Sequence, residues 1–253
     1  MYVVVAIPAR IKSSRLPNKV LAEIKGKPMI KRVLEQVSKT KLVDELYLCT
    51  DDEQLNRNAT EWGFKSIMTG KNFNSGSSRI SSVIKKLSSG NNLNETLIIN
   101  VQGDQPFINP KIIDQMVLFS KKQTIIPEVV TPIYKIKGQD LHNPNLVKTL
   151  ITSKKEIIYF SRSALPFIRD KDKETWSTEY QYWGHVGIYG YRGDILQQWN
   201  SLPESNLEKL EKLEQLRLID AGIKFSAFEV EGDFLSIDTQ DQLELARKIC
   251  VED

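Results

Sequence analysis

The sequence is poor in the residues that most often build disulfide frameworks and metal sites. It has two cysteines, Cys49 and Cys250, and two histidines. Two cysteines so far apart give neither a disulfide framework nor a cysteine metal cluster, and a reducing, cytoplasmic location is expected. A histidine metal site would require His142 and His185 to meet.

Long hydrophobic runs and a strong net charge are also missing. The apolar N-terminal run covers only residues 2–7, and no basic stretch precedes it, so a signal peptide is not expected. No segment approaches the ~20 apolar residues of a membrane span, so no membrane role is expected. The net charge is +3. The lysine and arginine pairs of the sequence are scattered among acidic residues, which argues against nucleic acid as a partner.

The first half alternates short apolar runs with segments of helical periodicity. Strands are expected at residues 2–7, 45–50, 65–68 and 97–101. Helices are expected around residues 29–37, 55–62, 80–87 and 112–117. This alternation predicts an α/β fold, with a mixed, mainly parallel central sheet flanked by helices.

The second half is less regular and predicts a smaller antiparallel insertion. Strands are expected at residues 128–134, 147–152, 156–160, 182–191 and 224–230. A polar loop is expected at 168–181, and an amphipathic helix with a charged face at 208–217. One domain over residues 1–253 is the economical interpretation, and the insertion around 128–191 could pair two chains.

The stretch IPARIKSSRLPNK places cations directly after the first strand. In open α/β sheets, ligands bind beyond the carboxyl ends of the strands. The planar guanidinium groups of Arg10 and Arg15 can each bind phosphate through two N–H donors, and the ammonium of Lys19 adds a compact positive charge. This combination suits a polyphosphate. The alternative is a solvated surface loop. Neither GxxxxGK[ST] nor GxGxxG is present, which argues against a P-loop kinase and a Rossmann dehydrogenase.

Two aspartates follow other expected strands. Asp104 comes after the run 97–101, and Asp238 comes after the apolar residues 234–237. Mg²⁺ favours one or two carboxylates together with phosphate oxygens and water. These aspartates and the basic loop could therefore form a metal–triphosphate site. The alternative for Asp104 is a carboxylate that only caps a turn.

The segment GHVGIYGYR could line a sugar pocket. On a regular strand His185, Gly187, Tyr189 and Tyr191 would share one face. A lone histidine is more often structural, so that alternative stays open.

Several motifs together resemble one family. The stretches IPARIKSSRLPNKVLAEIKGKPMI, VQGDQP, YFSRSALPF, HVGIYGYR, LEKLEQLR and IDTQDQL are similar, in order and approximate spacing, to the 3-deoxy-manno-octulosonate (Kdo) cytidylyltransferases, also called CMP-Kdo synthetases. The resemblance covers nearly the whole chain. It implies a nucleotide-diphospho-sugar transferase-like fold. The implied reaction transfers CMP from CTP to Kdo with Mg²⁺ and releases pyrophosphate.

The resemblance also implies roles for individual residues. Those implied to contact the nucleotide are Arg10, Arg15, Lys19, Ser75, Gly76 and Arg79. Those implied to bind the sugar acid are Gln102, Arg162, His185, Tyr189, Glu214 and Gln215. Asp104 and Asp238 would hold Mg²⁺, and together with Arg10 and Lys19 they form the expected catalytic set. The family further implies a homodimer that makes precursors of lipopolysaccharide or capsule.

The sequence departs from the family in the nucleotide-side loop. The family usually has SGT, an acid and Arg, whereas this chain has SGSSR. Ser77 keeps a hydroxyl, but Ser78 removes a carboxylate, which bears on base selectivity.

Three alternative functions stay open. One is the same chemistry on another acid sugar, such as 8-amino-Kdo or a sialic-type acid. Another is a nucleotide-sugar-dependent glycosyltransferase that uses the D-x-D of residues 170–172. The third is a non-catalytic module that binds nucleotide or RNA.

Overall fold

The computed structural model describes residues 1–11, 16–232 and 234–250. The strands, in chain order, are β1 (Tyr2–Ala9), β2 (Glu23–Ile24), β3 (Lys27–Pro28), β4 (Glu45–Thr50), β5 (Lys65–Met68), β6 (Thr96–Val101), β7 (Val129–Lys135), β8 (Lys148–Ile151), β9 (Glu156–Ser161), β10 (Trp183–His185), β11 (Ile188–Arg192) and β12 (Phe225–Glu229).

The α-helices are α1 (Met29–Val37), α2 (Glu53–Glu61), α3 (Gly76–Ser81), α4 (Ile84–Leu87), α5 (Pro110–Lys121), α6 (Trp176–Glu179), α7 (Gly193–Gln197), α8 (Asn206–Glu211), α9 (Leu216–Asp220) and α10 (Gln240–Ile249). The short 3₁₀ helices are η1 (Lys19–Leu21), η2 (Leu93–Glu95), η3 (Gly138–Asp140), η4 (Lys173–Thr175) and η5 (Trp199–Ser201).

Local sequence signals explain where the longer helices begin. Asp52 accepts hydrogen bonds from two backbone amides at the start of α2. Asn109 caps α5, and Pro110 follows in its first turn, where its missing N–H has no cost. Thr239 and Gln242 form a reciprocal capping box at the start of α10.

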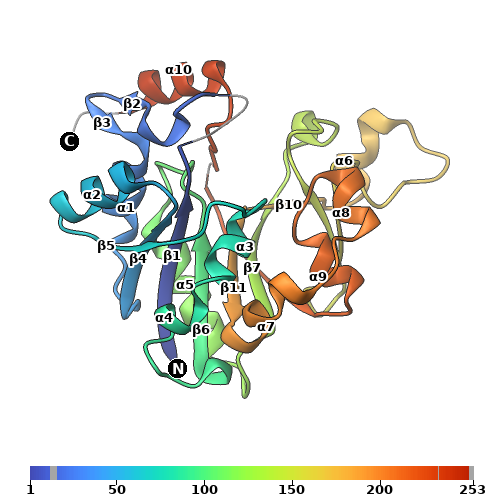
Figure 1. Ribbon diagram of the computed structural model, residues 1–253. Coiled ribbons are helices and arrows are strands. Elements are labelled where there is room, and N and C mark those ends of the chain that lie inside the picture. The colour runs from blue at the N-terminus through green and yellow to red at the C-terminus, as the bar shows by residue number, and fades with distance from the viewer. Residues whose placement is uncertain (12–15, 233, 251–253) are drawn as a thin grey trace.

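Ten strands form one mixed sheet, in the order β10-β8-β9-β12-β7-β11-β6-β1-β4-β5 (Figure 1). The strands β6, β1, β4 and β5 are parallel neighbours. Strand β11 lies between β6 and β7 and is antiparallel to both. The predicted mixed α/β sheet with an antiparallel part is confirmed.

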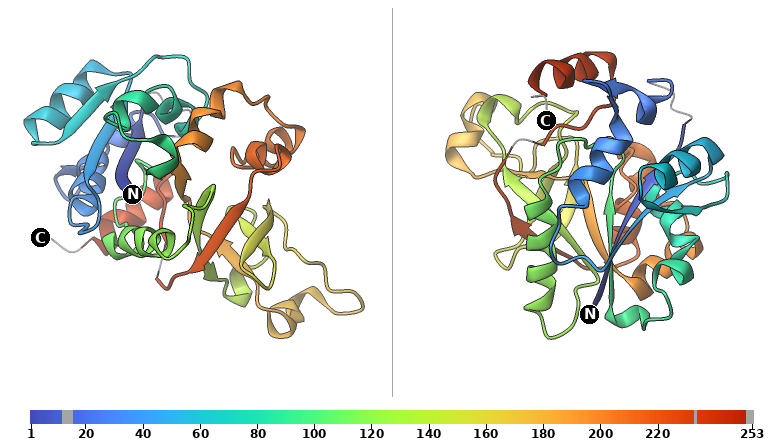
Figure 2. Two further views of the ribbon diagram at one scale, coloured as in Figure 1. Left: turned by 90° about the horizontal axis from the view of Figure 1, so that it is seen from below. Right: turned by 90° about the vertical axis from the view of Figure 1, so that its left-hand side faces the viewer.

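The part of the sheet beyond β11 closes on itself. Strand β10 pairs with β8 and also with β7. The order β7-β12-β9-β8-β10 therefore returns to β7 and makes a ring of five strands. In the two views of Figure 2 this part and the α6 segment form a lobe beside the parallel part.

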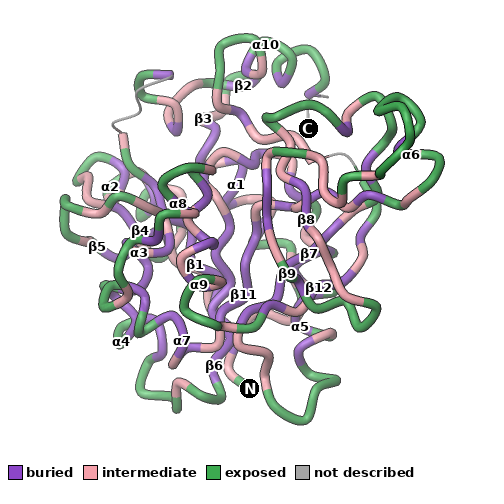
Figure 3. Tube along the Cα trace, turned by 90° about the vertical axis from the view of Figure 1, so that its right-hand side faces the viewer, coloured by how far each residue is buried: buried purple, intermediate pink, exposed green. Residues whose placement is uncertain are grey.

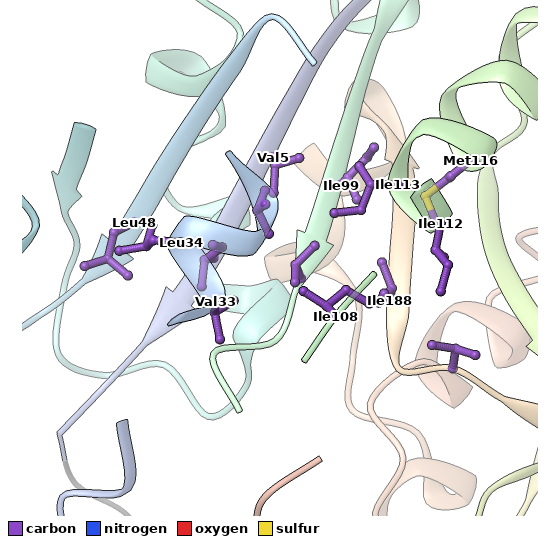
Figure 4. Close-up of a cluster of buried hydrophobic side chains, with 14 of the residues drawn as sticks. Val5, Val33, Leu34, Leu48, Ile99, Ile108, Ile112, Ile113, Met116 and Ile188 are labelled. Atoms are coloured by element: carbon purple, nitrogen blue, oxygen red, sulfur yellow. The ribbon is translucent and has the colours of Figure 1, made fainter. Parts of the chain in front are cut away.

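One face of the parallel sheet packs against α1, α2 and α5. The buried side chains of this layer alternate along β1 and include Val5, and they meet Val33 and Leu34 of α1 (Figure 4). Ile113 and Met116 of α5 belong to the same cluster. Because successive side chains of β1 point to opposite faces of the sheet, this one apolar strand contributes to the hydrophobic layers on both faces.

The opposite face packs against α3, α4, α7 and α9. Val4 and Ala6 of β1 lie in this second cluster with Ile80, Trp199 and Leu216. Figure 3 shows the resulting pattern, with buried central strands and an exposed α6 segment. No helix in the described ranges is long and apolar enough to cross a membrane.

Three predicted elements are interrupted. The helix expected over 80–87 splits into α3 and α4, because Val83 leaves the helical region. The strand expected over 182–191 splits into β10 and β11. The helix expected over 208–217 is wrong: Lys212 adopts a left-handed conformation with φ 54°, which ends α8 and turns Leu213 into the core.

Two further predictions need correction. The loop expected over 168–181 contains η4 and α6, and Trp176 is buried against Ile136, Leu141 and Tyr182. The apolar residues 234–237 were predicted as a strand before Asp238, but they form no strand.

Candidate active site

A polar cavity of about 300 Å³ lies at the carboxyl ends of β1 and β6. It is lined by Pro8, Ala9, Arg10, Lys19, Val20, Phe73, Asn74, Ser75, Gly76, Arg79, Gln102, Gly103, Asp104 and Asp238. Helix α10 covers the end of the sheet opposite the N-terminus (Figures 1 and 2). The cavity lies where the topology predicts a ligand.

One ammonium joins two carboxylates in this cavity. The Nζ atom of Lys19 lies 2.7 Å from Oδ2 of Asp104 and 2.8 Å from Oδ1 of Asp238. Only 13% of the Lys19 side chain is exposed, against 20% and 29% for the aspartates. The two acids therefore converge on one point that a cation occupies.

The backbone beyond β6 brings Asp238 to this point. The amide of Ile237 donates to the carbonyl oxygen of Asp104 at 2.9 Å. The Gln242 side chain then accepts from the amides of Asp238 and Thr239, at 2.8 and 3.0 Å. The start of α10 thus fixes the second carboxylate without a strand.

The two carboxylates stabilise the charged form of Lys19. Burial by itself lowers the pKa of Lys19, but the attraction of Asp104 and hydrogen bonds to both carboxylates outweigh it. The net pKa of Lys19 lies above its ordinary value, so the ammonium stays charged at neutral pH.

The donor set fits a divalent cation such as Mg²⁺. Two carboxylates point at one place beside a cavity lined by Arg10, and Mg²⁺ commonly uses two carboxylates with phosphate oxygens. No cluster of three or more His, Cys, Asp or Glu side chains suited to a metal occurs in the described part of the chain. The remaining ligands would have to come from substrate and water.

The SGSSR loop forms another part of the cavity wall. Ser75 caps α3 by accepting from the amide of Ser78 at 3.1 Å. A Cβ atom on Gly76 would lie 2.9 Å from Cγ of Pro8 and 3.4 Å from Oε1 of Gln102. Glycine is therefore required for the loop to approach the end of β1.

Arg79 is held within the protein wall. Its guanidinium lies 3.2 Å from the carboxylate of Asp51 and also donates to Thr69 and to the carbonyl of Gly70. It lies over the Phe73 ring at 5.8 Å. These contacts tie α3 to the segment after β5.

Ser78, at the third position of α3, has a partner outside the loop. The hydroxyl of Ser78 donates to Oδ1 of Asn200 at 2.5 Å, and Nδ2 of Asn200 donates to the Ser78 carbonyl at 3.1 Å. This paired contact fixes the loop to η5.

A buried polar network lies behind the loop, centred on Ser77. Its hydroxyl lies 3.0 Å from the Tyr191 hydroxyl and 2.9 Å from Oε1 of Glu214. Asn100 donates to it at 3.1 Å, and Gln102 donates to Asn100 at 3.3 Å. The network connects the nucleotide-side loop to the residues expected around the sugar.

Glu214 and Gln215 carry buried polar atoms without partners. Oε2 of Glu214 and Nε2 of Gln215 make no hydrogen bond to any described residue. Burial raises the pKa of Glu214, although hydrogen bonds from Ser75 and Ser77 oppose the shift. Such orphaned atoms have a desolvation cost that a polar ligand would remove.

A second cavity, of about 280 Å³, lies beside Glu214. It is lined by Asn72, Asn74, Ser75, Ser78, Glu204, Glu208, Lys209, Lys212, Glu214 and Arg217. Asn74 and Ser75 line both cavities, so the two are neighbours across the SGSSR loop.

His185 lies on β10 in the closed part of the sheet, and Tyr189 lies on the neighbouring β11. Nε2 of His185 lies 2.9 Å from the Thr131 hydroxyl, and its ring packs edge-on to Phe160 at 4.9 Å. The rings of His185 and Tyr189 are 5.1 Å apart. Burial lowers the pKa of His185 to about 3, so its ring is neutral.

Arg162 is anchored at the end of β9. Its Nε donates to the carbonyl of Glu211 at 2.8 Å, and its Nη1 donates to that of Pro144 at 3.0 Å. The Glu211 carboxylate in turn accepts from Ser161 and from the Arg162 amide. The guanidinium is therefore held in one place.

A buried lysine supports the loop that precedes β8. Nζ of Lys148 donates to the carbonyls of Asn143 and Leu146, at 2.8 Å each. Burial lowers the pKa of Lys148 to about 8, and repulsion from Arg162 adds to the shift.

The structure brings most of the predicted nucleotide and metal residues into the first cavity, and Gln102 with them. Arg15 lies outside the described residues. Glu214 lines the neighbouring cavity instead, and Arg162, His185, Tyr189 and Gln215 line neither of the two.

Sequence reasoning missed several supporting residues, among them Asp51, Asn100 and Glu211. Only Asn100 carried a usable signal, because it is a polar residue inside an otherwise apolar strand.

Comparison with known proteins shows the family of this chain. The family model described as Cytidylyltransferase matches residues 4–225. A 3-deoxy-manno-octulosonate cytidylyltransferase from Thermodesulfovibrio yellowstonii is 39% identical over 98% of both chains. The chain belongs to the 3-deoxy-manno-octulosonate cytidylyltransferase family. An 8-amino-3,8-dideoxy-manno-octulosonate cytidylyltransferase from Shewanella pealeana is 38% identical over 97% of both chains.

A solved structure supports the fold assignment. The CMP:2-keto-3-deoxy-manno-octonic acid synthetase complexed with CTP aligns with a TM-score of 0.88 and 36% identity, over 98% of both chains. This chain and that synthetase therefore share one overall fold.

Proposed function

We propose that this chain transfers CMP from CTP to the anomeric hydroxyl of Kdo, which yields CMP-Kdo and pyrophosphate. The observation that carries the proposal is the convergence of Asp104 and Asp238 on one cation, in a cavity shared with Arg10 and the SGSSR loop. Family membership supports the same reaction. The product would serve lipopolysaccharide or capsule synthesis.

The nucleotide would occupy the first cavity. Arg10 is exposed at the end of β1 and Lys19 faces the same space, so both would contact the phosphates. Ser75 and Gly76 would border the nucleotide through the backbone. Arg79 would act by holding this loop in place, because its guanidinium is already bound within the wall.

Asp104 and Asp238 would hold a magnesium ion. When bound, such an ion neutralises phosphate charge and can increase the acidity of a coordinated hydroxyl. The carboxylates would fix the position of the cation relative to β1, and through it the position of the triphosphate.

The chain's own groups would serve the remaining needs of the reaction. The sugar's hydroxyl oxygen attacks the α-phosphorus of CTP, a new P–O bond forms, and the bond to the pyrophosphate oxygen breaks. The hydroxyl proton passes to solvent. Arg10 and Lys19 would stabilise the charge that develops on the phosphoryl oxygens and on the leaving group.

The sugar acid would bind beside Glu214. The unpartnered Oε2 of Glu214 and Nε2 of Gln215 offer an acceptor and a donor for sugar hydroxyls. The anchored Arg162 would bind the sugar carboxylate with its other N–H donors. His185 and Tyr189 would shape the pocket wall, with His185 fixed as a neutral ring by Thr131.

8-amino-Kdo is the second candidate substrate. The 38%-identical relative from Shewanella pealeana that carries that name favours it. The glycosyltransferase alternative has little support, since Asp170 is exposed and pairs with Arg169 at 3.2 Å. Asp170 and Asp172 line a separate surface hollow.

We also propose that the protein forms a homodimer and is located in the cytoplasm. The exposed Phe167 and Ile158 of the region 128–191 are 68% and 50% accessible in the single chain. Such apolar side chains are the kind that a partner chain would cover. Size-exclusion chromatography with light scattering tests the dimer.

Pyrophosphate release tests the reaction. Purified protein is given Mg²⁺ and one of four nucleoside triphosphates, with Kdo, 8-amino-Kdo or a sialic acid as acceptor. The proposal expects release with CTP and Kdo above every other combination. Faster release with 8-amino-Kdo would reassign the sugar, and release independent of any sugar would contradict sugar transfer.

A further inference from the structure

The position of Lys19 has a consequence for metal binding. Its Nζ atom contacts one oxygen of each carboxylate, at 2.7 and 2.8 Å. Mg–O bonds are shorter, at ~2.1 Å. An ammonium and a metal ion therefore cannot share the point at which these two carboxylates converge.

We propose that the ammonium of Lys19 occupies the divalent-cation position in the free enzyme and leaves it when the nucleotide binds. This inference rests on the proposed metal role of Asp104 and Asp238. The phosphates of CTP would attract the ammonium, and its departure would open the carboxylates to the metal.

The surroundings of Lys19 allow such a movement. It is the first residue of η1, and it follows Asn18, which has a left-handed conformation with φ 54°. Its side chain lines the same cavity as Arg10, so the phosphate position lies within the space that the side chain already borders. The backbone can stay in place while the flexible lysine side chain turns.

The arrangement predicts coupling between metal and nucleotide. Metal binding without nucleotide must displace Lys19, at the cost of placing a cation near a divalent ion. Nucleotide binding removes that cost, so each ligand should strengthen the other. Lys19 would thus set the order of assembly, with little metal bound before CTP.

Titration with Mn²⁺, followed by the electron paramagnetic resonance of the free ion, tests this directly. Wild type, Lys19→Met and Arg10→Met are titrated alone and with a CTP analogue that has an α,β-methylene bridge. Without nucleotide, Lys19→Met should bind Mn²⁺ about tenfold more tightly than wild type, which is about 1.4 kcal/mol. Arg10→Met should bind like wild type.

The Arg10 variant is the matched control, because it removes one positive charge from the same cavity. Equal tightening in both variants would overturn the proposal and indicate a general charge effect. In Lys19→Met the coupling between Mn²⁺ and the analogue should shrink. The double variant Lys19→Met with Asp104→Asn should not show the tighter Mn²⁺ binding expected of Lys19→Met alone.

The remaining outcomes separate this proposal from the proposed function. Normal Mn²⁺ binding with the analogue, but no tightening in Lys19→Met, overturns the role of Lys19 alone. No Mn²⁺ binding by any protein, even with the analogue, overturns the metal role of the aspartates and this proposal with it. Circular dichroism checks folding, and Lys19→Gln replaces the Met variant if that one fails to fold.

Discussion

The backbone amide of Ile237 donates a hydrogen bond to the carbonyl oxygen of Asp104, across 2.9 Å. These residues are far apart in the sequence, and the bond places Asp238 beside Asp104. Two carboxylates that contact the Lys19 ammonium are thereby brought together from the end of β6 and from the segment before α10.

Asp104→Asn should abolish turnover. An amide in place of the carboxylate removes one negative ligand and leaves Lys19 with one acid, so kcat should fall by at least about a hundredfold. Steady-state kinetics at fixed Mg²⁺, with circular dichroism for the fold, measures this. Asp241→Asn is the control, because Asp241 is exposed in the first turn of α10. Near-normal turnover in Asp104→Asn would remove the metal role.

Ser77→Ala should disrupt the buried network. Asn100, Tyr191 and Glu214 would each lose a hydrogen-bond partner, which should cost about 1–3 kcal/mol in the free energy of unfolding. KM for Kdo should rise more than KM for CTP, because Glu214 is proposed to bind the sugar. Urea denaturation and two-substrate kinetics measure both effects. Ser82→Ala, on the same helical stretch but exposed, should change neither.

Gly76→Ala should weaken CTP binding. The new Cβ would approach Cγ of Pro8 to 2.9 Å, so the loop must shift away from β1. Overpacking of this kind costs about 1–3 kcal/mol in stability. Calorimetric titration with CTP should show reduced affinity. An unchanged affinity would mean that the loop does not border the nucleotide.

The stability of the protein in weak acid should depend on His185. Its pKa is lowered by burial to about 3 from the ordinary 6.5. Below pH 6.5 the unfolded chain takes up a proton that the folded chain does not. The free energy of unfolding should therefore fall with decreasing pH, by at most about 1.4 kcal/mol per unit.

Substitution of each histidine isolates this effect. His185→Gln should flatten the pH dependence of urea denaturation between about pH 5 and 6.5. His142→Gln should leave it unchanged, because His142 is exposed. The chain has no other histidine, so an unchanged slope in His185→Gln would show that His185 is not the group responsible.

Much of the parallel part of the fold follows from local sequence. The apolar runs of β1 and β6 are strands in the structure, and the rule that ligands bind at strand ends places Arg10, Lys19 and Asp104 together. Asp238 was expected at the same site for a wrong reason. It follows no strand, and the backbone bond from Ile237 to Asp104 positions it together with the bonds that Gln242 accepts at the start of α10.

The region proposed to bind the sugar depends on contacts that local patterns do not encode. Ser77 contacts Glu214 and Tyr191, which lie far from it in the sequence and near it only in the folded protein. The left-handed conformation of Lys212, which breaks the helix before Glu214, has no signature in a lysine-rich stretch. Long-range packing imposes it by burying Leu213.

The reaction itself gives the most direct test. Purified protein is incubated with CTP, Kdo and Mg²⁺, and the products are identified by mass spectrometry while pyrophosphate is quantified. CMP-Kdo and pyrophosphate should appear in equal amounts, and neither should form with Asp104→Asn. Absence of CMP-Kdo in the wild-type reaction, or pyrophosphate released without it, would contradict cytidylyl transfer to Kdo.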